Sequence, residues 1–179
     1  PKAHTRLLDA MVVRIGQRGW RCMVGYGHAP EHMALYCEDL DVLISGDMVL
    51  PRISTNISVY ASEPQSNPLQ LFLDSLERMR ALPDTVLILP SHGKPFKGLY
   101  ERINQLTQHH AERLAELLQA CFEHPMNAAQ ALPVLFKREL DLHQTTFAMG
   151  EAVAHLHTLW YQGKLRRFKQ DGVWMWQAL

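Results

Sequence analysis

Three loops carry residue types that can bind metal ions. The stretch "GHAPEH" places His28 and His32 four residues apart, "SGD" ends on Asp47, and "SHG" contains His92. Imidazole and carboxylate groups hold Zn²⁺ at about 2 Å, and they do so best from loops anchored on a rigid sheet. A glycine stands beside each candidate and would let backbones approach closely: Gly27, Gly46 and Gly93. On spacing alone, ordinary turn residues remain the commoner explanation of such a triple.

Each of these loops follows an apolar run that is typical of a β-strand. Residues 11–15 and 20–26 flank a turn-rich loop and predict a hairpin, and residues 33–37 and 42–45 predict a second one. Asn67 and Pro68 suit the N-cap and first position of a helix. The apolar stretch 85–89 then predicts a buried strand. The first hundred residues therefore predict a mixed α/β domain.

The remaining residues predict a small helical domain that ends in a hairpin. Helices are expected near 99–122, 127–136 and 143–164, followed by two strands around Asp171-Gly172. This order is that of a winged-helix module. We therefore predict two domains, 1–100 and 101–179. Trp174 and Trp176 lie two apart on the last strand, and we expect both to pack in the core of the second domain.

Composition limits the surroundings in which the protein works. The 179 residues carry a formal net charge of zero, which predicts no general attraction to nucleic acid or to acidic membranes. No apolar run is long enough to cross a bilayer, so no membrane partner is expected. The three cysteines are odd in number and widely spaced. This usage favours a reducing compartment, and a cytoplasmic location is expected.

The motifs "GHAPEH", "SGD" and "LPSHGKPF", in this order, resemble the later half of the metallo-β-lactamase fold hydrolases. The nearest resemblance is to the β-lactamase-like endoribonuclease branch, and it extends over the whole chain. It implies an α/β (α+β) fold, namely the C-terminal half of an αββα sandwich followed by a winged-helix-like domain. It also implies two divalent metal ions, with zinc expected and manganese or iron left open.

The resemblance also implies roles for individual residues. His28 would bind one metal ion, His92 would bind the second, and Asp47 would bridge both ions and act as the catalytic residue. His32 matches a histidine that the family does not use as a ligand, so we expect it to bond to the backbone. His155 and His157 lie two apart on a predicted helix, so they face different sides and should not share a metal ion.

The family's main metal signature, H-x-H-x-D-H, does not occur in this chain. It would supply two further ligands to each metal ion, so we expect this chain alone to be inactive. The expected partner is the N-terminal half of the same domain. Without that half, an edge and a face of the sheet should be left uncovered.

In the intact enzyme, the resemblance implies that a metal-activated water attacks an ester, thioester or phosphodiester in a small molecule or RNA. Candidate substrate contacts follow Asp47 in the sequence: Arg52, Ser54, Thr55 and Asn56. The alternative is a non-catalytic winged-helix module that binds nucleic acid or forms a homodimer. Its hairpin carries a cluster of basic residues that could contact phosphates: Lys164, Arg166, Arg167 and Lys169. The preceding helix lacks the basic side chains of DNA-reading helices, which favours packing or dimerisation.

Overall fold

A computed structural model describes residues 4–179 and shows a mixed α/β fold, as predicted. The chain divides into two compact units. The first consists of the N-terminal residues up to Thr55 together with 72–105, and the second of 56–71 together with 106–179. Helices α1 (Pro68–Met79) and α2 (Leu99–Glu123) contribute to both units. The domain boundary at residue 100 stays a prediction, because compactness does not show which stretch folds by itself.

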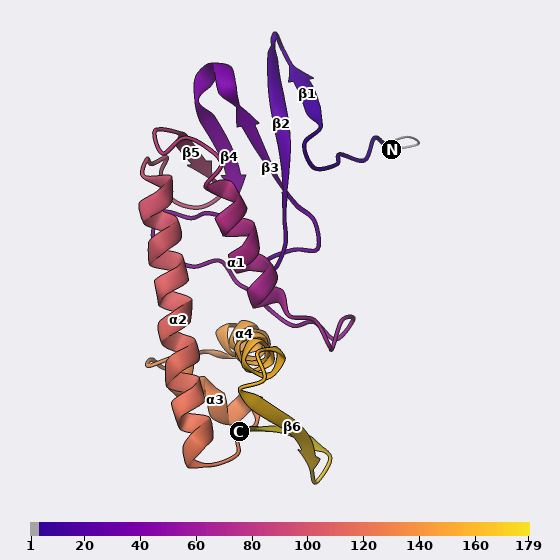
Figure 1. The fold of residues 1–179 in the computed structure, drawn as a ribbon, viewed down its shortest axis with the longest axis vertical. Helices are drawn as coiled ribbons and strands as arrows, with labels where there is room; N and C mark the ends of the chain where they lie inside the picture. The colour runs from indigo at the N-terminus through magenta and orange to yellow at the C-terminus, as the bar shows by residue number, and fades with distance from the viewer. Residues whose placement is uncertain (1–3) are drawn as a thin grey trace. The chain divides into compact units, whose positions relative to one another are not determined.

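The first unit is built on a five-stranded sheet in the order β1-β2-β3-β4-β5 (Figure 1). Its strands are β1 (Val12–Ile15), β2 (Arg18–Gly25), β3 (His32–Cys37), β4 (Val42–Gly46) and β5 (Leu87–Pro90). The first four strands pair in antiparallel fashion, which confirms both predicted hairpins. Strand β5 instead lies parallel to β4.

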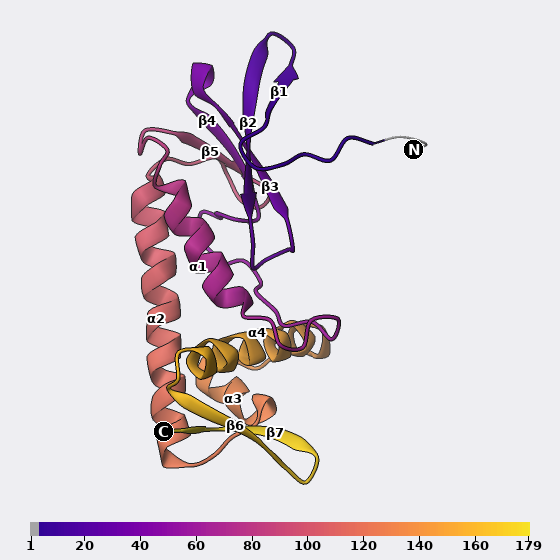
Figure 2. The ribbon, with the colours of Figure 1, turned by 45° about the vertical axis from the view of Figure 1, so that its right-hand side comes forward.

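Helix α1 lies along one face of this sheet (Figures 1 and 2). It begins at Pro68, as the sequence predicts. Within the first unit, the Ser75 hydroxyl accepts a hydrogen bond from the Tyr26 backbone N–H at 2.9 Å, and Arg78 donates to the Val24 carbonyl at 2.7 Å. Strand register places one set of side chains on a common face, and all of them are buried: Ala34, Tyr36, Leu43 and Ile88.

The opposite face of the sheet is apolar and only partly covered. Leu35 pairs with Ile44, and Ile44 pairs with Leu89, so these three side chains form a row across it. Ile44 is 37% exposed, and most of its neighbours on this face are only half-buried: Met33, Leu35, Val42, Leu87 and Leu89. Strand β1 lies at the sheet edge and exposes Val12 and Ile15. Within residues 4–179, this face is therefore partly open to solvent, and its covering by another part of the protein stays a prediction.

The second unit has its own apolar core. The second part of α2 is followed by α3 (Ala128–Leu135), α4 (Leu142–Tyr161) and the antiparallel strands β6 (Leu165–Gln170) and β7 (Val173–Ala178). This is the predicted order of elements. The core includes side chains from all of them: Leu117, Cys121, Ala131, Leu156, Leu165 and Trp176. Asn127 and Asp141 begin α3 and α4 as N-caps of complete capping boxes.

The prediction that both C-terminal tryptophans pack in the core is wrong for Trp174. Trp176 is 3% exposed, and its backbone pairs with that of Met126. Trp174 is 41% exposed and stacks on the guanidinium of Arg167. Alternation along the strand correctly places both rings on one face. It does not show how far along the hairpin the core extends, and Trp174 lies two residue pairs nearer the turn than Trp176, opposite Lys169.

Cys22, Cys37 and Cys121 are free thiols in buried positions. No helix within residues 4–179 is both long enough and apolar enough to cross a membrane.

Candidate metal centre

The topology of the first unit brings the three candidate loops to one end of the sheet. Strand β3 runs antiparallel to both β2 and β4, so β2 and β4 share a direction, and β5 is parallel to β4. His28 follows β2, Asp47 follows β4 and His92 follows β5. Loops that leave the same ends of co-directional strands meet at one edge, which is where catalytic and metal-binding groups commonly lie.

The three predicted ligands lie together at this edge. The Asp47 carboxylate stands between the two imidazoles, with Oδ2 at 3.5 Å from His28 Nε2 and Oδ1 at 3.4 Å from His92 Nε2. His28 and Asp47 are mostly buried, whereas the side chain of His92 is 68% exposed. Each carboxylate oxygen therefore faces a different histidine.

These separations fit ligands that share metal ions. Two donors at about 2.0–2.1 Å from one tetrahedral ion stand roughly 3.3 Å apart, close to both distances in this site. A carboxylate with one histidine at each oxygen is the arrangement expected of a bridge between two ions. Among residues 4–179, no three His, Cys, Asp or Glu side chains are grouped so as to hold one ion. If two ions were bound here, the described residues would offer two donors to each, fewer than the three or four protein ligands that zinc usually has.

Two hydroxyl groups orient these ligands. Thr55 Oγ1 lies 3.0 Å from His28 Nδ1, which leaves His28 Nε2 directed at Asp47. The Ser91 hydroxyl donates to Asp47 Oδ1 at 2.5 Å. Thr55, a predicted substrate contact, is 5% exposed and lies behind the predicted ligand His28. Hydrogen bonds of this kind set the orientation and basicity of metal ligands. Nothing in the local sequence distinguishes Thr55 from its polar neighbours.

His32 holds the backbone of the Asp47 loop. Its Nε2 accepts a hydrogen bond from the Asp47 N–H at 3.1 Å, which confirms the expected structural role. Burial, and secondly the nearby His28, lower the pKa of His32, which favours the neutral acceptor form. Gly46 permits this contact, because its φ is +55° and a Cβ there would lie 2.5 Å from the His32 ring.

A cavity of about 500 Å³ lies beside the exposed His92. Its walls come from two loops, Pro51–Ile53 and His92–Phe96, so Arg52 and Lys94 bring positive charge to it. Arg102 fixes the first loop by donating to the carbonyls of Leu50 and Ile53 at 2.6 and 2.9 Å.

Of the other predicted substrate contacts, Ser54 is half-buried and is absent from the lining of this cavity. Asn56 belongs to the second unit, where its side chain hydrogen-bonds to Ser58. Their roles as substrate contacts stay predictions.

Comparison with known proteins agrees with this geometry. Residues 1–92 match the model of the metallo-beta-lactamase superfamily, and residues 114–179 match the family described as "Metallo-beta-lactamase-like, C-terminal domain". Over its whole length, the chain is 54% identical to a beta-lactamase domain protein from Burkholderia ambifaria, whose crystal structure superposes with a TM-score of 0.97. It is also 30% identical to a metallo-beta-lactamase family protein from Thermus thermophilus, with a TM-score of 0.86.

A curated relative is the probable metallo-hydrolase YqjP of Bacillus subtilis (strain 168), which is 28% identical over 151 residues and 80% of this chain. The chain spans about half of each relative: 53% of the Burkholderia protein, 56% of the Thermus protein and 46% of YqjP. The superfamily match covers residues 1–92 of 179, and these residues include all three predicted ligands. The chain belongs to the metallo-beta-lactamase superfamily.

Proposed function

We propose that this chain is the C-terminal portion of a metal-dependent hydrolase, in which His28, Asp47 and His92 hold two divalent ions, with zinc expected. The observation that carries this proposal is the Asp47 carboxylate, which presents one oxygen to each histidine at 3.4–3.5 Å. The relative YqjP is named as a probable metallo-hydrolase, which supports the same class of activity. His and carboxylate donors also accept manganese or iron.

The residues of this chain would bind the metal ions and orient the side chains that hold them. Bound metal ions would lower the pKa of a water toward 7 and polarise a carbonyl or phosphoryl oxygen. Asp47 would keep the two sites at a fixed spacing, because Ser91 and the His32-bonded backbone hold its carboxylate. Thr55 would keep His28 Nε2 directed into the site. Each of these groups would fix the position of a metal ligand, so small displacements of the ligands should reduce activity strongly.

The cavity beside His92 suggests the class of substrate. It combines apolar side chains from Ile53 and Phe96 with the cations Arg52 and Lys94. An ester, thioester or phosphodiester that carries a negative charge near the scissile bond would suit it. RNA, as in the endoribonuclease branch, satisfies this requirement, and so does a small anionic ester.

The remaining ligands would come from the N-terminal half of the same domain. The half-exposed apolar face around Leu35 and Ile44 supports this, because a sandwich fold buries such a face against a second sheet. With two donors per ion, this chain alone should bind metal weakly and be inactive.

The alternative, a nucleic-acid-binding module, receives little support from helix α4. Most of its second half is buried, from Ala152 and Ala154 to Leu159, so few side chains are free to read bases. In the hairpin, Arg166 bonds to Gln177 and Arg167 bonds to Gln65. Lys164 and Lys169 are exposed and could contact phosphates.

Elemental analysis together with an activity panel tests the proposal. We expect about two metal ions per molecule of the longer protein and almost none in this chain. Asp47→Asn in the longer protein should lower metal content below one ion and lower hydrolysis at least about a hundredfold. Asp84→Asn serves as the control, because Asp84 is an exposed carboxylate that accepts a hydrogen bond from the Tyr100 backbone N–H.

The panel contains a charged thioester, a charged ester and a single-stranded RNA. Hydrolysis of any one that depends on Asp47 supports the proposal and identifies the substrate class. Absence of metal from the longer protein, even after reloading with zinc or manganese, contradicts it. Two tightly held ions in this chain alone would contradict the split ligand set.

A further inference from the structure

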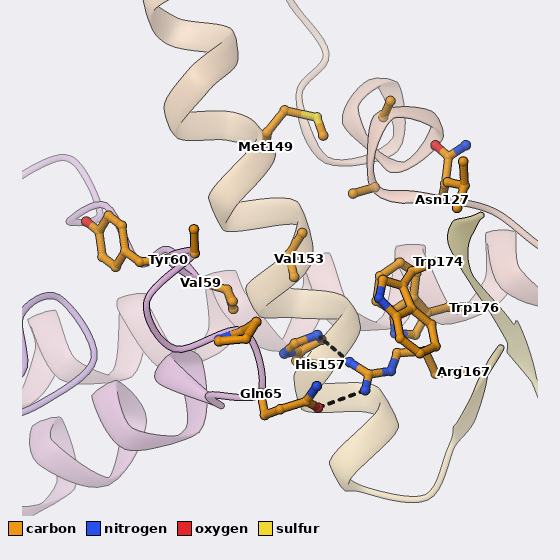
Figure 3. Close-up of a pocket in the computed structure, with 15 residues that line it drawn as sticks. Val59, Tyr60, Gln65, Asn127, Met149, Val153, His157, Arg167, Trp174 and Trp176 are labelled. Atoms are coloured by element: carbon orange, nitrogen blue, oxygen red, sulfur yellow. Dashed lines mark hydrogen bonds between the residues drawn. The ribbon is translucent and has the colours of Figure 1, made fainter. Parts of the chain in front are cut away.

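The second unit contains a cavity of about 440 Å³ that is formed entirely by its own residues (Figure 3). This volume lies within the roughly 300–1,000 Å³ of small-molecule sites. Its walls are mainly apolar and come from α4, β7 and the segment before α1: Val59, Met149, Val153, Trp174 and Trp176. Figure 3 shows Gln65, His157 and Arg167 together at one end and Met149 at the other.

Arg167 brings a positive charge to this cavity. Its guanidinium lies between two indoles, 4.0 Å from the centre of the Trp160 ring and 4.3 Å from that of Trp174. It donates hydrogen bonds to Gln65 Oε1 at 2.8 Å and to His157 Nε2 at 3.3 Å. Stacking and two hydrogen bonds therefore hold the planar group in one orientation.

Neither hydrogen-bond partner neutralises Arg167. Since a guanidinium can only donate, His157 Nε2 must accept, and His157 Nδ1 then donates to the Ser66 carbonyl at 2.9 Å. The pKa of His157 is lowered, mainly by burial, which favours its neutral form. Gln65, the other partner, carries no charge. In the described chain, 4–179, no carboxylate oxygen comes within 4.0 Å of Arg167. Within the part of the chain that the structure describes, two of its five N–H donors have hydrogen-bond partners.

Trp176 also lines this cavity. The indole Nε1–H of Trp176 is buried and has no hydrogen-bond partner among residues 4–179. Because this N–H is out of reach of solvent, Trp176 contributes the apolar surface of its ring to the cavity and no hydrogen bond. The cavity thus combines an apolar wall with a guanidinium that no carboxylate among residues 4–179 neutralises.

We propose that this cavity binds a small carboxylate with an apolar body, whose carboxylate contacts Arg167 and whose body lies against Val153, Met149 and the indoles. A carboxylate matches the guanidinium in shape and charge, because the planar fork donates two parallel hydrogen bonds to it. A phosphate dianion matches less well, since Arg167 is the one cation among the lining residues. The proposal is independent of the metal centre.

Matched probes on this chain test the proposal. We would titrate 4-phenylbutyrate, octanoate and indole-3-acetate by calorimetry, and compare 4-phenylbutyrate with 4-phenylbutan-1-ol, which has the same body and no charge. We expect at least one acid to bind with a Kd below about 1 mM, and the alcohol to bind at least about tenfold more weakly. In NMR spectra, the chemical shift of the Trp176 indole N–H, assigned with the variant Trp176→Phe, should change on addition of the acid.

Two variants locate the site. Arg167→Gln should weaken binding of the acid at least about tenfold. Arg166→Gln serves as the control. Arg166 is next to Arg167 on β6 and bonds to Gln177, so this variant should bind the acid as tightly as the native chain does. Val153→Phe, which fills the cavity, should abolish binding.

Equal affinity for acid and alcohol would overturn the proposal, and that comparison needs only the native chain. Binding unchanged by Arg167→Gln, or no binding of the three acids below about 10 mM, would overturn it as well.

Discussion

At the scale of single residues, we expect the proposed metal centre to depend on the groups that touch the predicted ligands as much as on the ligands themselves. Thr55 Oγ1 contacts His28 Nδ1, and His32 Nε2 accepts from the Asp47 backbone. Both contacts join residues that are distant in the sequence, and both restrict the orientation of a predicted ligand. Such partners typically change metal affinity about 10- to 100-fold when they are removed.

Thr55→Val should therefore lower the metal affinity of the longer protein about 10- to 100-fold. Valine has nearly the same shape but cannot bond to His28 Nδ1, so the imidazole loses its fixed orientation. Competition with a chelator measures the change. Thr55→Ser keeps the hydroxyl and should stay within about threefold of the native affinity. Equal metal affinities of the native protein and both variants would show that the contact between Thr55 and His28 does not affect metal binding.

Gly46→Ala should destabilise this chain by about 1–3 kcal/mol more than Gly98→Ala does. Both glycines have positive φ, so both substitutions strain the backbone. Only at Gly46 would the new Cβ meet another side chain, the His32 ring at 2.5 Å, whereas the space around Gly98 is open. Urea unfolding gives the difference. A similar loss in both variants would mean that the His32 contact adjusts freely.

At the scale of elements, α2 and α4 meet through buried histidines. His110 on α2 lies 3.3 Å from His155 on α4, measured between Nδ1 and Nε2. Burial lowers the pKa of His110 to about 3 and that of His155 to about 4. The neighbours His109 and Arg113 lower the pKa of His155 further. On α4, burial raises the pKa of Glu151 to about 7. Protonation of these groups therefore affects how well the helices pack.

The stability of the chain should fall as pH decreases from 6.5 to 4.5. In this range the unfolded state binds protons at His110 and His155 that the folded state excludes, while folded Glu151 keeps a proton that the unfolded state releases. For these three groups, two protons bound on unfolding and one released leave a net of one, or about 1.4 kcal/mol per pH unit. Burial also lowers the pKa values of His32 and His157, so these two residues should make the slope steeper. Urea midpoints at several pH values measure this slope.

Glu151→Gln removes the opposing contribution and should steepen this slope. Glu112→Gln changes an exposed carboxylate on α2 and should leave it as it is. A slope that both variants share with the native chain would mean that Glu151 does not titrate in this range.

At the scale of the whole molecule, the open sheet face is the main departure from a closed fold. Leu35, Ile44 and Leu89 form an apolar row that the described chain only partly covers. Exposed apolar sheet surfaces promote association between copies. The second unit, by contrast, has a core of its own.

Ile44→Ser should have different effects in this chain and in the longer protein. In this chain it should reduce self-association and change the free energy of unfolding by less than about 1 kcal/mol, because the side chain is 37% exposed. In the longer protein, where we propose that this face is covered, it should cost about 2–4 kcal/mol. Sedimentation velocity and urea unfolding measure both quantities.

Ile53→Ser serves as the control, since Ile53 is 62% exposed on a loop and its change should be small in both forms. Equal losses for Ile44→Ser in the two forms would contradict the proposed covering of this face.

The strands, the helices and the three ligand candidates could be predicted because their signals are local. Gly16–Gly19 and Asp171-Gly172 mark turns by residue type, Pro68 marks a helix start, and apolar alternation marks the strands. His28, Asp47 and His92 became candidates because each follows such a strand, and the family resemblance of their three motifs then favoured a metal site over ordinary turns. The core position of Trp176 also followed from alternation, whereas the exposure of Trp174 did not.

By itself, then, the sequence determined which segments form strands and helices and which residues can act as ligands, since these properties depend on neighbours a few positions away. The tertiary structure alone decided what those residues contact. Thr55 meets His28 across 27 positions, and Arg167 meets Gln65 across 102. Such contacts arise when the chain packs, and no local pattern of residues encodes which distant side chain will stand opposite.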